Sequence, residues 1–200
     1  MYDQKKAVEA AKSGAKKYAA PGLDYLRQFA GIDCGSRDVE GNAKVVEIID
    51  GMLSQIQGIK IEHHFFEGYG INIVAKLTPE NPTGKIILNA HTDTVFKKGQ
   101  AEEFPFRIDG DTAYGLGIID CKGGIVVAIH AVKVMQEAGM LPNKEIVFIL
   151  TAMRKSVLPP VTKSLTKNVP VQRPASCLNL PDWRTAFSHQ EKVPAQSPLM

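Results

Sequence analysis

The sequence has 200 residues, which suits one ordinary domain or one and a half small ones, and its 44% of hydrophobic residues is enough for a real core. Its net charge of +3 arises in residues 153–200, which hold 7 Lys and Arg and only 2 Asp and Glu. Residues 1–152 hold 17 Lys and Arg and 19 Asp and Glu. The basic excess therefore does not indicate nucleic-acid binding, and no apolar run is long enough to span a membrane.

The cysteines and the first residues both bear on the compartment. Three cysteines without a pairing pattern argue against a disulfide-stapled secreted domain. The charged start of the chain lacks the apolar segment of a secretory signal. We therefore expect a cytoplasmic protein with no membrane partner.

The first part of the chain predicts helices. Residues 4–18 have helix-forming composition, Pro21-Gly22 interrupts them, and residues 23–29 resume with amphipathic spacing. Residues 31–41 have the composition of a loop. Asn42 or a residue near it is expected to cap a further helix, whose apolar residues recur at helical spacing: Val45, Val46, Ile48, Ile49 and Leu53.

Strands dominate the middle of the chain. Residues 59–66 and 69–77 show the alternation and β-branching of strands, and residues 85–90 are a short apolar run that suits a buried strand. Residues 123–138 predict a helix, and residues 145–150 a central strand. This order predicts an α/β fold with a mixed sheet flanked by helices.

Three polar residues stand where such a sheet binds ligands. His91 and Asp93 follow the strand at residues 85–90, and Asp120 lies at a glycine-rich turn before the helix at residues 123–138. Imidazole and carboxylate groups are good ligands for zinc and similar ions. Asp93 could orient His91, and Asp120 could bridge two cations.

Each motif is a weak indication of a site by itself, because a His-x-Asp pair arises often by chance. The combination of the motifs and their order along the chain indicate a site more strongly. His63 and His64 lie within a strand pattern, and we expect one on each face without metal. His130 is expected on a helix surface. Cys121 is expected to be a packing residue rather than a nucleophile, because no second histidine follows at a suitable place.

The sequence HTDTV, followed by YGLGIIDCKGGIVVAIHA and then EIVFILTA, carries a resemblance. It resembles the di-zinc metallopeptidase family of carboxypeptidase G, acetylornithine deacetylase, succinyl-diaminopimelate desuccinylase, aminoacylase and peptidase T, over about residues 20–152. Runner-up families of di-zinc aminopeptidases have a similar catalytic fold, but their second motif usually differs from DCKGG.

The resemblance implies a role for each candidate residue. His91 and Asp120 would bind metal, Asp120 as the bridge between two zinc ions, with cobalt or manganese as alternatives. Asp93 would be the catalytic residue that orients His91. The implied activity is hydrolysis of amide bonds in small peptides or N-acyl amino acids, by a dipeptidase, carboxypeptidase or deacylase such as a deacetylase, and the intact family implies a homodimer.

The resemblance ends after Ala152. In the family the strand continues into Asp-Glu-Glu-Val-Gly, whose glutamates supply the general base and a metal ligand, whereas this chain has Met153-Arg154-Lys155-Ser156. Cations at these positions would repel metal ions. The later ligands and the dimerisation domain are also missing, so the resemblance covers only the amino-terminal part of the catalytic domain.

Residues 153–200 differ in composition from the rest of the chain. They hold 7 of the 12 prolines and none of the 17 glycines, and they show no sustained periodicity, so we expect little order.

The genetic code suggests an origin for this aberrant tail. ATG-AGG-AAG-TCN encodes Met153 to Ser156, and one restored base regroups it as GAT-GAG-GAA-GTC, which encodes Asp-Glu-Glu-Val. The same shift can convert Asn179-Leu180 into Glu-Pro, where the family places another ligand. We therefore predict a frame-shifted tail and an inactive, truncated enzyme. The alternative is a non-catalytic binding or regulatory module that keeps the fold.

Overall fold

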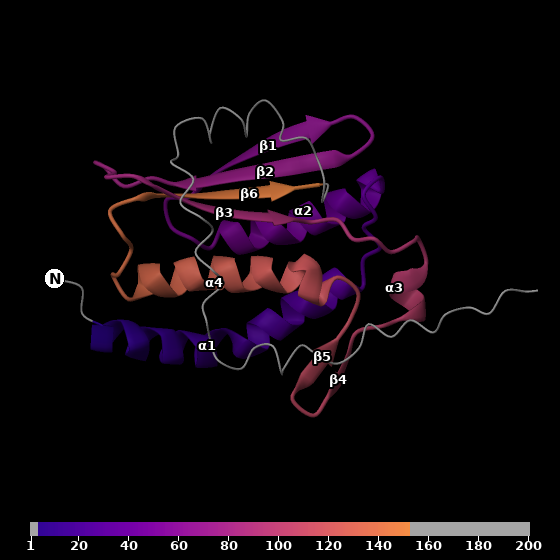
Figure 1. Ribbon diagram of the computed structural model, residues 1–200, viewed down its shortest axis with the longest axis horizontal. Helices are drawn as coiled ribbons and strands as arrows, with labels where there is room; N and C mark the ends of the chain where they lie inside the picture. The colour runs from indigo at the N-terminus through magenta and orange to yellow at the C-terminus, as the bar shows by residue number, and fades with distance from the viewer. Residues whose placement is uncertain (1–3, 153–200) are drawn as a thin grey trace, which may run out of the picture.

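The computed structural model, which describes residues 4–152, contains a four-stranded mixed sheet with helices on one side of it (Figure 1). The strand order is β1-β2-β6-β3, with bounds Lys60–Phe66, Gly70–Leu77, Glu145–Thr151 and Lys85–His91. β3 pairs with β6 in parallel, and the other neighbours are antiparallel. The predicted α/β class with a mixed sheet is confirmed.

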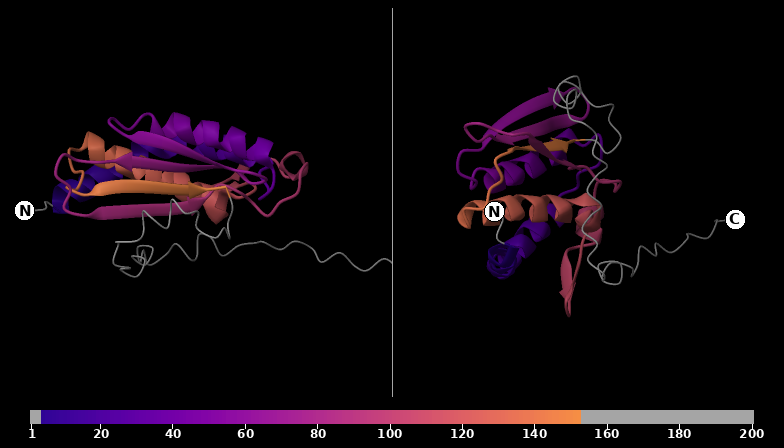
Figure 2. Two further views of the ribbon diagram at one scale, coloured as in Figure 1. Left: turned by 90° about the horizontal axis from the view of Figure 1, so that it is seen from above. Right: turned by 60° about the vertical axis from the view of Figure 1, so that its left-hand side comes forward.

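Three helices lie on the same side of this sheet, as Figure 1 and Figure 2 show. They are α1 (Gln4–Ala30), α2 (Val39–Leu53) and α4 (Gly123–Glu137). Two of them, α2 and α4, pack on the face of the sheet, and the third, α1, packs along α4. Alternate residues of β6 point to the helices and join the main core: Ile146, Phe148 and Leu150. The residues between them, Val147 and Ile149, pack with Val74 on the opposite face. The apolar run of β6 is thus buried on both faces, as predicted for a central strand.

The predicted interruption at Pro21-Gly22 is wrong, because α1 continues through both residues. Proline removes one helical hydrogen bond and bends a helix without always ending it, and the second half of α1 runs at an angle to the first in Figure 1. Contacts with α4 hold the two halves together: a Cβ on Gly22 would lie 3.5 Å from Val126, and the Tyr18 ring stacks on His130. His130 is therefore half-buried between helices rather than on an open surface.

The start of α2 also differs from the prediction. The N-cap is Asp38, whose carboxylate accepts a hydrogen bond of 2.8 Å from the Gly41 amide, so the helix begins inside the predicted loop. Asn42 is buried and bonds across elements instead: its Oδ1 accepts from the Ile71 amide and its Nδ2 donates to Thr92 Oγ1. The residue expected to cap a helix therefore joins α2 to β2 and to the loop after β3.

Short elements fill the chain between β3 and α4. They are α3 (Gln100–Glu103), a hairpin of β4 (Arg107–Asp109) and β5 (Thr112–Tyr114), and one irregular turn at Ile118–Lys122, which we call the Asp120 turn. The Asp120 turn leads directly into α4, which crosses back to β6. A parallel neighbour requires such a crossover.

The parallel pairing of β3 with β6 defines the edge where the candidate site lies. His91 is in register with Thr151, so the two strands end side by side. The Thr92 amide donates to the Thr151 carbonyl oxygen at 2.8 Å, and the Ala152 amide donates to Asn72 Oδ1 at 2.6 Å. The end of β6 is therefore fixed next to the end of β3.

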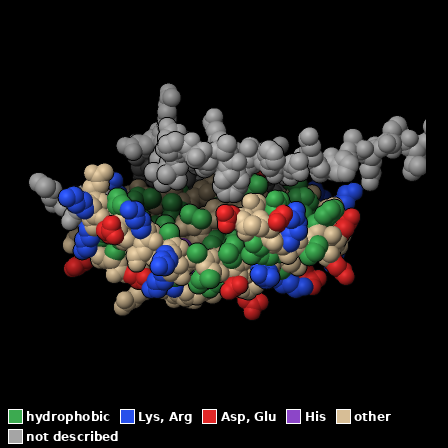
Figure 3. All heavy atoms as spheres, turned by 90° about the horizontal axis from the view of Figure 1, so that it is seen from below, with side chains coloured by type: hydrophobic (Ala, Val, Ile, Leu, Met, Phe, Trp, Pro, Cys, Tyr) green, Lys and Arg blue, Asp and Glu red, His purple; other side chains and the backbone are tan. Residues whose placement is uncertain are grey.

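Positive and negative side chains are interspersed on the face seen from below, which includes α1 (Figure 3). This view lacks the single-sign patch that is typical of a nucleic-acid interface. Among residues 4–152, no helix combines the length and apolar character needed to cross a bilayer. The predictions about residues 153–200, including their disorder, lie outside the described residues.

Candidate metal centre

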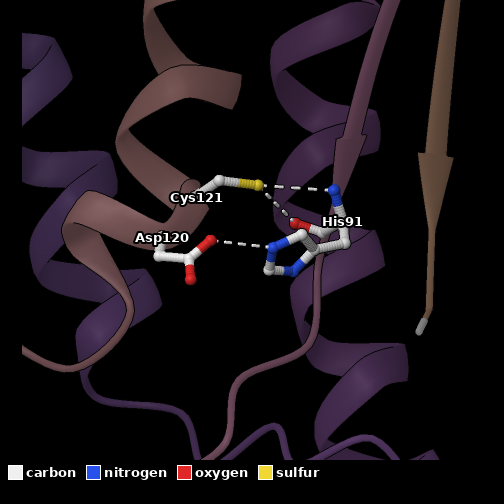
Figure 4. A group of neighbouring side chains, drawn as sticks. All are labelled: His91, Asp120 and Cys121. Atoms are coloured by element: carbon white, nitrogen blue, oxygen red, sulfur yellow. Dashed lines mark hydrogen bonds and ion pairs between the residues drawn. The ribbon is translucent and has the colours of Figure 1, made fainter. Parts of the chain in front are cut away.

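His91 ends β3, and acidic residues engage both of its ring nitrogens; Figure 4 shows the contact with Asp120. Nδ1 lies 3.0 Å from the main-chain oxygen of Asp93 and 3.1 Å from its Oδ1, while Nε2 lies 2.9 Å from Asp120 Oδ1. A carbonyl oxygen can only accept a hydrogen bond, so Nδ1 carries a proton. Nε2 is therefore the nitrogen available to a ligand, and the three predicted site residues lie together.

Asp93 is the buried member of the group, with a side chain only 2% exposed. Its Oδ1 faces His91, and its Oδ2 accepts a hydrogen bond from Ser36 Oγ. Ser36 is held close because Gly35 forms a β-bridge with Thr94, whose amide donates to the Cys34 carbonyl. Asp93 is thus fixed on both sides, which suits a group that orients an imidazole.

Asp120 reaches His91 because its turn departs from helical geometry. Gly117 starts the turn at φ +73°, and a Cβ there would lie 2.6 Å from a methyl carbon of Thr94. Asp120 itself has φ −128° and ψ 90°, and the peptide bond to Cys121 is cis. The Asp120 side chain is 45% exposed, so it is open to a ligand from solvent.

Cys121 contacts the main chain of His91. Its Sγ donates to the His91 carbonyl oxygen at 3.1 Å and accepts from the His91 amide at 3.3 Å. Figure 4 shows the sulfur and the Asp120 carboxylate both directed toward His91. Cys121 is therefore part of the site, in addition to any packing role.

The surroundings of His91 favour its charged form. The Asp93 side chain, and then the Cys121 side chain, raise the pKa of His91 to about 11 against the opposing effect of burial. A site that stabilises one positive charge between acidic groups also suits a metal cation, which would replace the proton on Nε2.

A buried lysine joins the Asp120 turn to α1. Lys122 is fully buried, and its Nζ donates to the Phe29 carbonyl oxygen at 2.8 Å. Burial lowers the pKa of Lys122. This contact gives a carbonyl group in the last turn of α1 a donor, and it anchors the end of the Asp120 turn to α1.

The donor set fits a divalent cation. Neutral imidazole nitrogen, carboxylate oxygen and thiolate sulfur are all zinc ligands, and one such atom each from His91, Asp120 and Cys121 lies within 4.8 Å of the others. His63 does not join them: it contacts Asp50, while His64 lies near Glu62, so the two occupy opposite faces of β1 as predicted.

A family of known proteins matches the part of the chain that carries these residues. Residues 87–153 match the model of "Peptidase family M20/M25/M40", and this span contains His91, Asp93 and Asp120. The predicted resemblance to this family is confirmed. The M20 family consists of metallopeptidases, so the chain resembles hydrolases that depend on metal ions.

A curated relative gives the same result. The chain is 36% identical to carboxypeptidase G2 of Pseudomonas sp. (strain RS-16) over 121 residues, which cover 59% of this chain and 28% of the relative. The chain thus spans little more than a quarter of that protein.

Solved structures share the fold. The di-peptidase Dug1p of Saccharomyces cerevisiae matches at a TM-score of 0.63 and 15% identity, over 81% of this chain and 38% of that one. Human carnosine dipeptidase 1 matches at a TM-score of 0.61 and 15% identity, over 72% of this chain and 34% of that one. The M20 metallo-carboxypeptidase Sso-CP2 of Sulfolobus solfataricus matches at a TM-score of 0.56 and 18% identity, over 66% of this chain and 30% of that one. At these identities the likeness concerns the fold.

Sequence reasoning missed two contributors to the site. Ser36 bonds Asp93 across 57 positions in the chain, and no local pattern marks such a contact. Lys122 belongs to the DCKGG motif, yet nothing in the motif indicates that its side chain turns inward. The sequence predicts a packing role for Cys121, and the structure places its sulfur against the His91 main chain, close to the Asp120 carboxylate.

Proposed function

We propose that the chain contributes the metal-binding half of an amide-bond hydrolase, with His91 and Asp120 as ligands and Asp93 as the residue that positions His91. The observation that carries this proposal is the arrangement of His91: Nδ1 is held by Asp93, and Nε2 faces Asp120 at 2.9 Å. The relatives named as dipeptidases and carboxypeptidases support the assignment.

The chain's own residues perform distinct tasks in this proposal. Ser36 fixes Asp93, which keeps the Nδ1 proton of His91 in place and directs Nε2 outward. Asp120, which is partly exposed, meets both solvent and substrate at the edge of the sheet. A divalent metal bound there would supply Lewis-acid polarisation of the amide carbonyl.

The finer assignments follow the family. We propose zinc as the metal, two ions in an intact enzyme, with cobalt or manganese as substitutes. The substrate is a small peptide or an N-acyl amino acid, cleaved by a dipeptidase, carboxypeptidase or deacylase. The intact enzyme would be a cytoplasmic homodimer.

We further propose that the 200-residue chain is inactive and that residues 153–200 are a frame-shifted tail. A pair of carboxylates at positions 154 and 155 would follow the end of β6, where Thr151 is in register with His91. The sequence instead has Arg154 and Lys155 there. Without those carboxylates we expect one weakly bound metal ion rather than two tightly bound ions.

The test compares the chain as given with a version whose reading frame is restored by one base after Ala152. Zinc binding is titrated by calorimetry, and hydrolysis of dipeptides and N-acyl amino acids is assayed. The restored chain should bind more zinc and alone hydrolyse substrate, and His91→Ala in the restored chain should abolish both gains. Turnover by the chain as given, or no gain on restoration, would overturn the proposal for the tail.

A further inference from the structure

Cys121 occupies a place that the proposed roles of the other residues leave unexplained. Its sulfur lies against the main chain of His91, the same residue whose Nε2 faces Asp120. Asp120 and Cys121 follow His91 in the chain by 29 and 30 residues. Cys34 offers a contrast within the described residues: it is fully buried, and its sulfur contacts the Thr92 carbonyl oxygen at 3.5 Å. Cys121 is instead partly exposed and faces the site.

We propose that Cys121 is a metal ligand, so that His91, Asp120 and Cys121 form a three-donor site for one soft divalent cation such as zinc or cobalt. This inference rests on the proposed function, because it uses the same imidazole and carboxylate. It adds a thiolate ligand and states which cations the site prefers. Thiolate ligands select softer metals over magnesium, calcium or manganese.

The distances permit such a site. The three donor atoms lie within 4.8 Å of one another. Tetrahedral zinc with bonds of about 2.0–2.3 Å requires donor atoms about 3.3–3.6 Å apart, so shifts of roughly 1 Å suffice. Asp120 and Cys121 are also partly exposed, which leaves room for such a shift.

Binding requires a redistribution of protons and hydrogen bonds. The metal would take the place of the Nε2 proton of His91, and the Cys121 thiol would release its proton to water to form the thiolate. The thiol would lose its hydrogen bond to the His91 carbonyl oxygen but could keep accepting from the His91 amide. An amide donor to a metal-bound sulfur is a common stabilising feature of thiolate sites.

Cobalt provides the test, because a cobalt–thiolate bond produces a sulfur-to-metal charge-transfer band in the near ultraviolet. The full chain is titrated with Co²⁺ in the presence of a non-thiol reductant, and the spectra of four variants are compared with it. Cys121→Ser and His91→Ala remove proposed ligands. Cys34→Ser and Cys177→Ser are the matched thiol controls, since each leaves Cys121 in place.

We expect the band in the wild-type chain and in both controls, and its loss in Cys121→Ser. Cobalt affinity should fall by at least about tenfold in Cys121→Ser, since outer-shell partners alone are worth about 10- to 100-fold. Circular dichroism confirms that each variant is folded. X-ray absorption of the wild-type cobalt complex should show a sulfur neighbour, which does not depend on any variant.

The outcomes separate this inference from the proposed function. Cobalt that binds in a His91-dependent manner without a charge-transfer band or a sulfur neighbour would overturn the role of Cys121 and support the His91–Asp120 site. A band that survives in Cys121→Ser but is lost in a control would also overturn it. If the folded wild-type chain binds no cobalt, both the inference and the proposed metal centre are wrong.

Discussion

Replacement of Asp93 by asparagine is the sharpest test of how the site presents His91. Asparagine has nearly the shape of aspartate but no charge, and the position is buried, with a side chain 2% exposed. The wild-type carboxylate lies 3.1 Å from His91 Nδ1 and also accepts from Ser36. The variant should therefore keep its packing while it loses the charge that holds the imidazole.

The expected size of the effect follows from this contact. Carboxylates that orient a metal-binding histidine are worth about 10- to 100-fold in metal affinity. This range corresponds to roughly 1.4–2.7 kcal/mol at 25 °C. Metal binding should fall by this amount in Asp93→Asn, because the new side chain could direct its amide nitrogen toward the ring and favour the wrong tautomer.

The assay is a calorimetric titration of the full chain with zinc at constant pH and ionic strength. Asp111→Asn is the matched control, because it makes the same chemical change at an exposed position in the hairpin between β4 and β5. The control should bind zinc as the wild type does. Urea denaturation checks that neither change unfolds the chain.

Ser36 extends the test. Ser36→Ala removes one hydrogen bond to Asp93 and should weaken zinc binding by several-fold, in line with about 0.5–1.5 kcal/mol for a single bond. Because Ser36 acts through Asp93, it should have little further effect in the Asp93→Asn background. Unchanged zinc affinity in Asp93→Asn, or fully additive effects of the two changes, would refute the reasoning.

Three further predictions concern the scaffold. Gly117→Ala should lower the free energy of unfolding by about 1–2 kcal/mol and weaken zinc binding, since φ is +73° there; Gly124→Ala, where a Cβ meets nothing within 4 Å, should do neither in the same urea and zinc titrations. Asn42→Ala should cost about 1–3 kcal/mol by urea denaturation, because it leaves the Ile71 amide without its acceptor and removes a donor to the buried Thr92 hydroxyl; an unchanged midpoint would contradict this. Lys17 donates to Glu137 and is the main cause of the lowered pKa of Glu137. The contact therefore stabilises the fold fully at pH values above the usual carboxyl pKa, and this stabilisation is lost as the pH falls through the lowered pKa. Glu137→Gln should therefore cause a small loss of melting temperature at pH 7 that disappears in acid, and a loss independent of pH would argue against the ion pair.

Local patterns in the sequence were enough for most of the fold. Apolar runs and alternation placed the four strands of the sheet, and the helix that follows Asp120 was placed correctly, because these elements bury their own periodic faces. One error arises where a tertiary contact overrides local preference, and the other where a local helix cap was overlooked. α1 continues through Pro21 because α4 packs along it, and α2 begins before Asn42 because Asp38 caps it.

The same division holds for the site. The sequence by itself determined that His91 and Asp93 stand together after a buried strand and that Asp120 occupies a glycine-rich turn. Only the tertiary structure decided that Nε2 of His91 faces Asp120, that Ser36 fixes Asp93, and that the Cys121 sulfur joins them. These contacts link residues 29 to 57 positions apart, and such pairings depend on the crossover through α4 and on the loop after α1 rather than on any local pattern.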